Sequence, residues 1–161
     1  MKKTAGRFAS GCFRNFSSNQ MVIISDPVLL EVKMRNLYSI QGAADRKCLV
    51  RDFYAREGIS CVGWASLYIF HTRTRIYAEI HDVFVEEWAR NRGHGTILVR
   101  DVIEHVCQYA TRERRPVYLQ LTSGPKRVAA NKMYIKLGFT LVAAAPDESG
   151  TNFYRMMCDP E

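Results

Sequence analysis

The chain has 161 residues, of which 47% are hydrophobic, and a formal net charge of +7. This length suits one domain with its own core, and the apolar fraction excludes a chain that is disordered as a whole. The longest apolar run, residues 61–70, is about half the ~20 residues that a membrane-spanning helix needs, so we expect no membrane span.

Positive charge is concentrated at the start of the chain. Four of the 23 basic side chains and none of the 16 acidic ones lie in residues 1–20, which we interpret as a basic extension ahead of one domain over residues 21–161. Such a composition is also typical of organelle targeting segments. The remainder is mildly basic, which argues against a nucleic-acid binder and suits an anionic ligand.

Cysteine usage bears on the compartment. The five cysteines form no CxxC pair and their number is odd, so a zinc site or a disulfide framework is not expected. The pattern favours buried thiols in a reducing compartment, and we predict a cytoplasmic protein without a bound metal.

The first predicted elements are a short strand over residues 21–25 and a helix over residues 28–40. Asp26 and Pro27 follow the pattern of a helix cap and a first-turn proline, and the apolar residues after them have helical spacing. Gly42 is expected to end this helix.

Three strands are predicted next, over residues 47–55, 59–72 and 76–87, with turns at 56–58 and 73–75. Alternation in the third strand assigns its side chains to two faces. One face is expected to hold Ala78, Ile80, Asp82 and Phe84, and the other Tyr77, Glu79, His81, Val83 and Val85.

From Thr96 the apolar spacing becomes helical, with a stripe of Leu98, Val102, Val106 and Tyr109. A strand over residues 115–123 follows. A second helix then begins after Gly124-Pro125 and ends at Gly138, and a hairpin of residues 139–145 and 152–158 closes the chain. This order of elements predicts an α/β fold with a mixed sheet.

The stretch RNRGHG, residues 90–95, lies between a predicted strand and a predicted helix. Glycine here lets the backbone approach a phosphate, and the unpaired N–H groups of the first helical turn attract anions. The spacing matches neither GxGxxG nor GxxxxGK(S/T), so the stretch alone also fits a tight turn.

A second motif follows after another strand. Residues 125–139 read PKRVAANKMYIKLGF. Together the two motifs resemble the GNAT superfamily of acyl-CoA N-acyltransferases, whose cofactor loop matches Arg90, Gly93 and Gly95. The AxxxYxxxGF helix of that family matches Ala130, Tyr134, Gly138 and Phe139. Residues 78–85 and 151–156 are also similar to the family's central strand and ending, whereas the resemblance is weak before residue 60.

The resemblance implies the GNAT fold, a mixed central sheet whose parallel strands splay apart around acetyl-CoA, with helices flanking the sheet. It also implies transfer of an acetyl group to a primary amine in a ternary complex. The residues it assigns to the cofactor are Val83, Phe84, Val85, Arg90, Asn91, Arg92, Gly93, His94, Gly95, Thr96 and Asn131. Many family members carry asparagine where Arg127 stands, whereas other branches carry arginine there, so the resemblance leaves this cofactor contact open.

For the chemistry, the resemblance implies Glu79 as the base that accepts the amine proton. His81 on the same face, or a water, is the alternative. Tyr134 is expected to protonate the leaving sulfur. The acceptor is open between small molecules and proteins, and the sequence also permits a homodimer. The alternative function is a non-catalytic acyl-CoA sensor or interaction module with the same fold.

Overall fold

The computed structural model describes residues 21–23, 28–35 and 48–161. Eight strands of this part form one sheet, in the order β1-β2-β3-β4-β5-β6-β8-β7. Only the β5–β6 pair is parallel; the other neighbours are antiparallel. The strands are β1 (Met21–Ile23), β2 (Val28–Arg35), β3 (Cys48–Glu57), β4 (Ser60–His71), β5 (Ile76–Val85), β6 (Val117–Ser123), β7 (Thr140–Ala143) and β8 (Asn152–Cys158).

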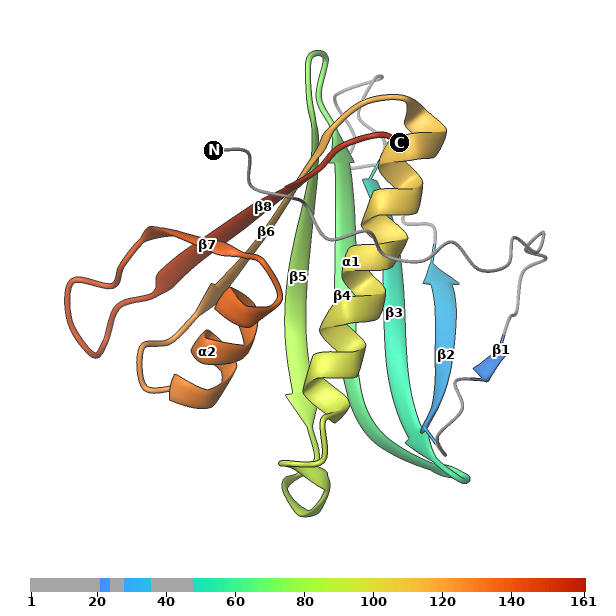
Figure 1. Cartoon of the computed structure of the whole chain (residues 1–161), viewed down its shortest axis with the longest axis vertical. Helices are drawn as coiled ribbons and strands as arrows, with labels where there is room; N and C mark the ends of the chain where they lie inside the picture. Colours follow the sequence, from blue (N-terminus) through green and yellow to red (C-terminus); the bar gives the residue numbers. More distant parts are fainter. Residues whose placement is uncertain (1–20, 24–27, 36–47) are drawn as a thin grey trace, which may run out of the picture.

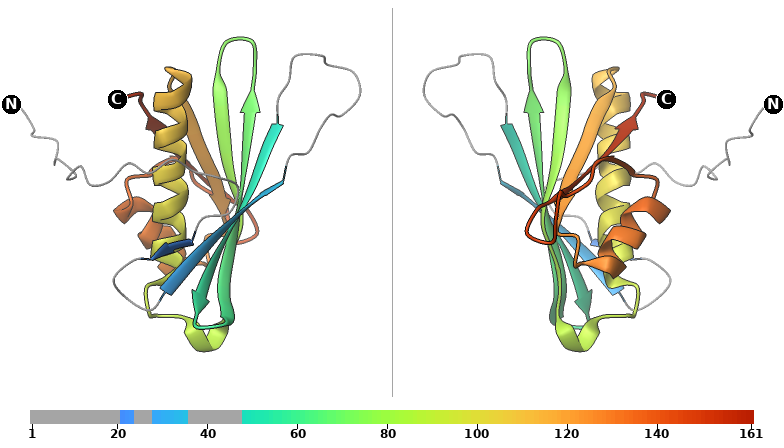
Figure 2. Two further views of the ribbon diagram at one scale, coloured as in Figure 1. Left: turned by 90° about the vertical axis from the view of Figure 1, so that its right-hand side faces the viewer. Right: turned by 90° about the vertical axis from the view of Figure 1, so that its left-hand side faces the viewer.

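Three helical segments interrupt the later strands: the short 3₁₀ turn η1 (Glu87–Ala89), α1 (His94–Glu113) and α2 (Val128–Lys136). Helix α1 connects the two parallel strands β5 and β6 and lies along one face of the sheet (Figure 1; Figure 2). A parallel pair requires such a crossover. Within the described residues, no helix is long and apolar enough to cross a membrane.

Most sequence-based elements are confirmed, including the mixed α/β class, both helices after residue 90 and the closing hairpin. The predicted stripe on α1 is buried at all four positions. Its side chains pack onto a layer of fully buried residues from the middle of the sheet. These sheet residues include Ala65, Leu67, Ile69, Ile76, Ala78, Val117 and Leu119.

The helix predicted for residues 28–40 is wrong over Val28–Arg35, which form β2. This strand pairs with β3 along its whole length, from Val28 opposite Glu57 to Arg35 opposite Val50. Its sequence, VLLEVKMR, satisfies a two-residue period as well as a helical one. A partner strand decides such an ambiguous apolar run in favour of the sheet. The basic extension of residues 1–20 and the end of the predicted helix, including Gly42, lie outside the described residues.

A β-bulge at Asp82 corrects the predicted faces of β5. Asp82 has a φ of +53°, and the register shifts so that His81 pairs with Ser66 but Phe84 pairs with Trp64. One extra residue in a strand moves all later side chains to the opposite face. Phe84 therefore shares the face of Glu79 and His81, whereas Val83 and Val85 turn toward the core beneath α1.

Cysteines follow the prediction only in part. All four that the structure describes are free thiols, but Cys158 alone is buried, and Cys48, Cys61 and Cys107 are half-buried.

Candidate active site

The two parallel strands separate toward their C-terminal ends. They pair from Ile76 opposite Val117 to Ile80 opposite Leu121, and the pairing stops there although β5 continues to Val85 and β6 to Ser123. Beyond the bulge, β5 remains paired with β4 on its other side. Its backbone edge toward β6 thus has no strand partner among the described residues, and can pair with an extended ligand.

The start of α1 lies at the mouth of this gap. Gly93 caps the helix with a left-handed φ of +87°, which favours glycine, and no side chain caps the first turn. The first helical hydrogen bond runs from Ile97 N–H to the Gly93 carbonyl, at 3.0 Å. By helix geometry, the N–H groups of the three residues between them have no intrahelical acceptor. They offer donors and a partial positive charge to an anion.

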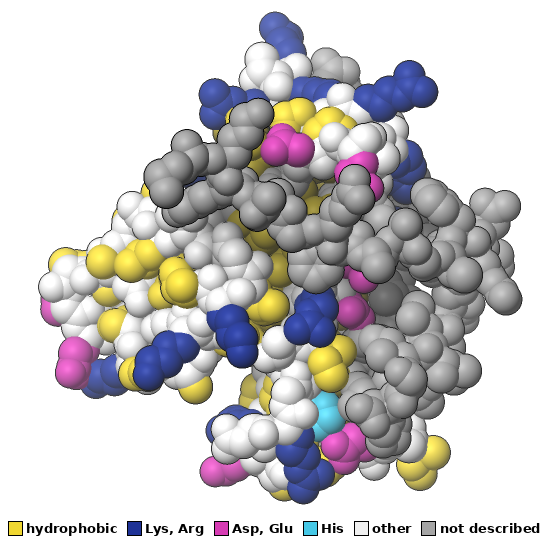
Figure 3. All heavy atoms as spheres, viewed as in Figure 1, with side chains coloured by type: hydrophobic (Ala, Val, Ile, Leu, Met, Phe, Trp, Pro, Cys, Tyr) yellow, Lys and Arg dark blue, Asp and Glu magenta, His cyan; other side chains and the backbone are white. Residues whose placement is uncertain are grey.

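There is room for a Cβ at both glycines of the loop. A Cβ added to Gly93 would meet nothing within 4 Å, and one added to Gly95 would meet Met133 Sδ and Val85 Cγ2 at 3.7 Å, an ordinary contact. Packing inside the protein therefore does not explain a glycine at either position. Figure 3 shows a hollow in this face, between α2 and the turn that contains η1, with Lys and Arg side chains near its rim.

The loop of residues 90–95 is bonded to the end of β5 through the side chain of Arg90. Arg90 Nε donates to the Val85 carbonyl at 3.0 Å, and its guanidinium lies 5.9 Å from the centre of the Phe84 ring. Asn91 adopts a left-handed φ of +63°. Arg90 thus joins the end of β5 to the loop.

Glu57, which the sequence analysis missed, anchors the loop from β3. Its carboxylate oxygens lie 2.7 Å from His94 Nε2 and 3.5 Å from Arg92 Nη1. His94 is 3% exposed, so its side chain faces the interior rather than the hollow. Among the predicted cofactor residues, His94 is therefore placed to contribute its backbone N–H. No local sequence signal marks Glu57, because the contact joins residues 37 positions apart.

Buried polar atoms without a partner gather near the start of α2. Ser123 Oγ and Asn131 Oδ1 are buried without a hydrogen bond from the described residues, although Asn131 Nδ2 donates to the carbonyls of Gly124 and Pro125. His94 Nδ1 is unpartnered in the same way. Buried polar atoms normally have hydrogen-bond partners. A polar ligand beside the end of β6 could supply the partners of Ser123 Oγ and Asn131 Oδ1.

Glu79 and His81 lie together on the sheet face opposite α1. His81 Nε2 is 3.1 Å from Glu79 Oε2, and the two side chains are 49% and 34% exposed, respectively. The other carboxylate oxygen accepts a hydrogen bond from Gln120 on β6. The His81 ring also meets Tyr68 edge-on, 5.0 Å between centres. A partly exposed carboxylate with a histidine beside it can accept a proton from a ligand.

Tyr134 lies on the buried face of α2. It is 4% exposed, and its ring contacts Phe139 and Tyr154, with centres 6.1 and 5.7 Å away. Burial raises the pKa of its phenol, and the Arg127 guanidinium partly offsets this. The hydroxyl therefore stays protonated at neutral pH.

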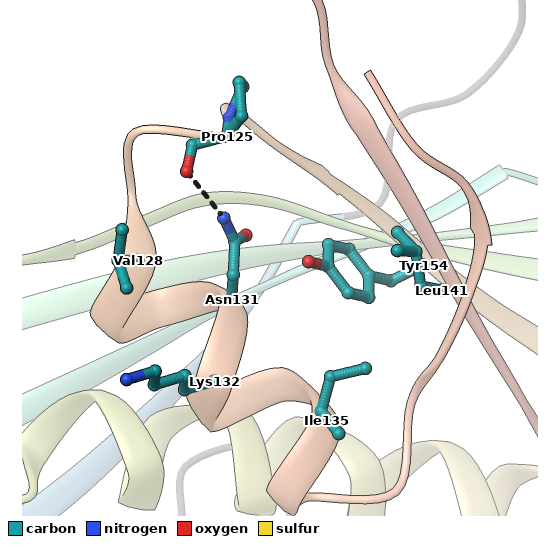
Figure 4. Close-up of a pocket in the computed structure, with 7 residues that line it drawn as sticks. All are labelled: Pro125, Val128, Asn131, Lys132, Ile135, Leu141 and Tyr154. Carbon is teal, nitrogen blue, oxygen red and sulfur yellow. Dashed lines mark hydrogen bonds between the residues drawn. The ribbon is translucent and has the colours of Figure 1, made fainter. Parts of the chain in front are cut away.

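A second hollow lies between α2 and the strands β7 and β8 (Figure 4). The residues that line it are Pro125, Val128, Asn131, Lys132, Ile135, Leu141 and Tyr154. Its wall is mainly apolar, and half-exposed side chains such as Val128 and Ile135 form its rim. Of the predicted site residues, only Asn131 reaches it.

A splayed parallel pair with a glycine-led helix at its mouth is the arrangement expected of the GNAT fold. The chain belongs to the acetyltransferase (GNAT) family, whose model matches residues 22–139. The family assigned from the two motifs is confirmed. A comparison with curated proteins finds no match.

Solved structures share the fold. The chain is similar to the IAA acetyltransferase from Bacillus cereus ATCC 14579 (21% identity, 67% of this chain and 77% of that one, TM-score 0.52). It is also similar to yncA from Salmonella typhimurium, solved with its cofactor acetyl-CoA (19% identity, 70% of this chain and 66% of that one, TM-score 0.55). A third match is a chain of the NatC complex bound to Gag peptide and CoA (18% identity, 68% of this chain and 71% of that one, TM-score 0.54).

Proposed function

We propose that residues 21–161 form an acetyltransferase domain that moves an acetyl group from acetyl-CoA to a primary amine, directly and in a ternary complex. One observation carries this proposal: the unpaired edge of β5 opens beside the uncapped, glycine-led start of α1. An acyl-CoA combines an extended amide-containing arm with a pyrophosphate, which are the two kinds of group that these features bind.

In this proposal the backbone of Val83–Val85 pairs with the amide groups of the pantetheine arm. The N–H groups of the loop from Arg90 to Thr96 bind the pyrophosphate. Asn131 adds a side-chain contact, which its unpartnered Oδ1 supports. Hydrogen bonds to a charged group contribute roughly 1.5–3 kcal/mol each, so several together would give micromolar affinity or better.

The thioester supplies an activated acetyl group, and the chain's own residues handle protons and charge. An amine attacks only as the free base, so Glu79 accepts the ammonium proton, directly or through a water, with His81 as the alternative acceptor. A backbone N–H near Val83 stabilises negative charge on the carbonyl oxygen. Tyr134 donates its proton to the departing sulfur, and its phenol is protonated at neutral pH, as that role requires.

The acceptor is expected to carry positive charge at neutral pH. Glu79 is 34% exposed on the sheet face opposite α1 and pairs across the sheet with Tyr68, and the stacked Trp64–Phe84 pair lies further along the same face. Carboxylates and aromatic faces both attract ammonium groups. A cytoplasmic location remains part of the proposal, on the strength of the free thiols.

A screen of primary amines with acetyl-CoA, which follows thiol release, tests the proposal. The library should include alkylamines, polyamines, amino acids and short peptides with free N-termini. Amine-dependent thiol release and an N-acetylated product support the transferase. Tight acetyl-CoA binding without release on any amine would reject it and favour the non-catalytic sensor. Gly95→Glu serves as the negative control.

A further inference from the structure

Three polar residues lie in register across three neighbouring strands. Glu79 on β5 is opposite Gln120 on β6, and Gln120 is opposite Arg155 on β8. Residues opposite each other point to the same face of a sheet, with adjacent strands about 4.8 Å apart. The amide of Gln120 therefore lies between the carboxylate of Glu79 and the guanidinium of Arg155.

Hydrogen bonds join this row from end to end. Gln120 Nε2 donates to Glu79 Oε1 at 2.5 Å, and Arg155 Nη2 donates to Gln120 Oε1 at 3.4 Å. Only one orientation of the Gln120 amide satisfies both neighbours, because a carboxylate accepts and a guanidinium donates. Arg155 is itself held over the Phe153 ring, 5.3 Å from its centre.

The row constrains one carboxylate oxygen and leaves the other for chemistry. Glu79 Oε1 accepts a hydrogen bond from Gln120, whereas Oε2 lies 3.1 Å from Nε2 of the half-exposed His81. We propose that Gln120, held by Arg155, is a positioning residue that orients the Glu79 carboxylate toward the acceptor amine. This inference rests on the proposed role of Glu79 as the base.

A double-mutant cycle of Glu79→Gln and Gln120→Leu tests the inference, with the amine that gives the fastest thiol release in the screen. Gln120→Leu keeps an aliphatic side chain of similar volume, one atom shorter, and removes its hydrogen bonds. We expect it to lower kcat about tenfold or more, because misplaced catalytic groups lose rate steeply. In the Glu79→Gln background it should have no further effect. Tyr118→Phe, on the same strand and face, is the control and should keep parental kcat.

Two further readouts separate positioning from a structural role. The rate deficit of Gln120→Leu should shrink at high pH, where free amine is abundant and a base is less needed. Arg155→Met should reproduce part of the deficit from the other end of the row. Melting temperature and acetyl-CoA affinity should stay near the parental values. Gln120→Asn, which keeps the amide but shortens its reach, replaces Gln120→Leu if that variant does not fold.

Additive losses of rate in the cycle, or a deficit that is constant with pH, would overturn the positioning role while leaving Glu79 as the base. Parental kcat in Glu79→Gln would instead reject Glu79 as the base and this inference with it. The two failures are therefore distinguishable by the single variants.

Discussion

Gly95→Glu, with Gly95→Ala as its matched control, tests the anion site at the start of α1. Both side chains fit the free protein, because a Cβ at Gly95 meets its nearest atoms at 3.7 Å. Alanine is better than glycine in a helix by roughly 0.5–1 kcal/mol. A glutamate in the first turn is favourable by about 0.3–1 kcal/mol through the helix dipole. Neither substitution should lower the melting temperature of the ligand-free protein.

The ligand distinguishes the two variants. A carboxylate about 4 Å from a phosphate repels it by about 4 kcal/mol at an effective dielectric constant of 20. Each 1.4 kcal/mol is a factor of ten, so the dissociation constant for acetyl-CoA should rise about 10³-fold in Gly95→Glu. Gly95→Ala adds no charge, and its Cβ has room, so the affinity of this variant for acetyl-CoA should stay within a few-fold of the parent's, roughly 1 kcal/mol at most.

Thermal unfolding with acetyl-CoA measures this difference. At a concentration of 100 times the parental dissociation constant, the ligand stabilises the native state by about 2.7 kcal/mol. For a chain of this size that corresponds to a rise of roughly 5–11 °C in melting temperature. The rise should appear in the parent and in Gly95→Ala and be absent in Gly95→Glu. An equal rise in all three proteins would refute the phosphate-binding role of the loop.

Four further predictions concern single residues. Glu79→Gln should lower kcat, within the roughly 10²–10⁴-fold range of general bases, and the loss should shrink at high pH; a profile parallel to the parent's contradicts the base role. Tyr134→Phe should lower kcat at least about tenfold, or 1.4 kcal/mol of barrier, at an unchanged melting temperature, and loss of stability instead would indicate packing. Burial raises the pKa of Asp101 to about 6, so the carboxylate destabilises the fold as pH rises through 6. Asp101→Asn should therefore raise the melting temperature at pH 8 but not at pH 4, and an equal change at both would disprove this. Gly63→Ala places a Cβ 2.7 Å from the Phe84 carbonyl oxygen and should cost about 1–3 kcal/mol in denaturant unfolding, whereas an unchanged midpoint would show that the strand yields freely.

Local spacing in the sequence was enough for the helices and for most strands. The stripe on α1 repeats every three or four residues, and the glycines at 93 and 138 sit in left-handed conformations at a helix start and a helix end. These features depend only on residues a few positions apart, so they can be predicted from the sequence alone. The two motifs that identified the family are local in the same sense, and residues 22–139 match it.

Non-local pairing decided what the sequence could not. Residues 28–35 carry both periods, and the strand conformation follows from pairing with β3. The bulge at Asp82 depends on the register with β4, and it reverses the faces predicted for Phe84 and Val85. Each of these outcomes is set by a partner distant in sequence.

The details of the candidate site were decided in the same way. Glu57 reaches His94 across 37 positions, and Gln120 reaches Glu79 across 41. Such contacts form only when the strands have assembled, because the hydrogen bonds that orient a side chain come from whichever strand lies beside it. The sequence therefore indicated candidate residues for the proposed chemistry, and the tertiary structure determined how those residues are held.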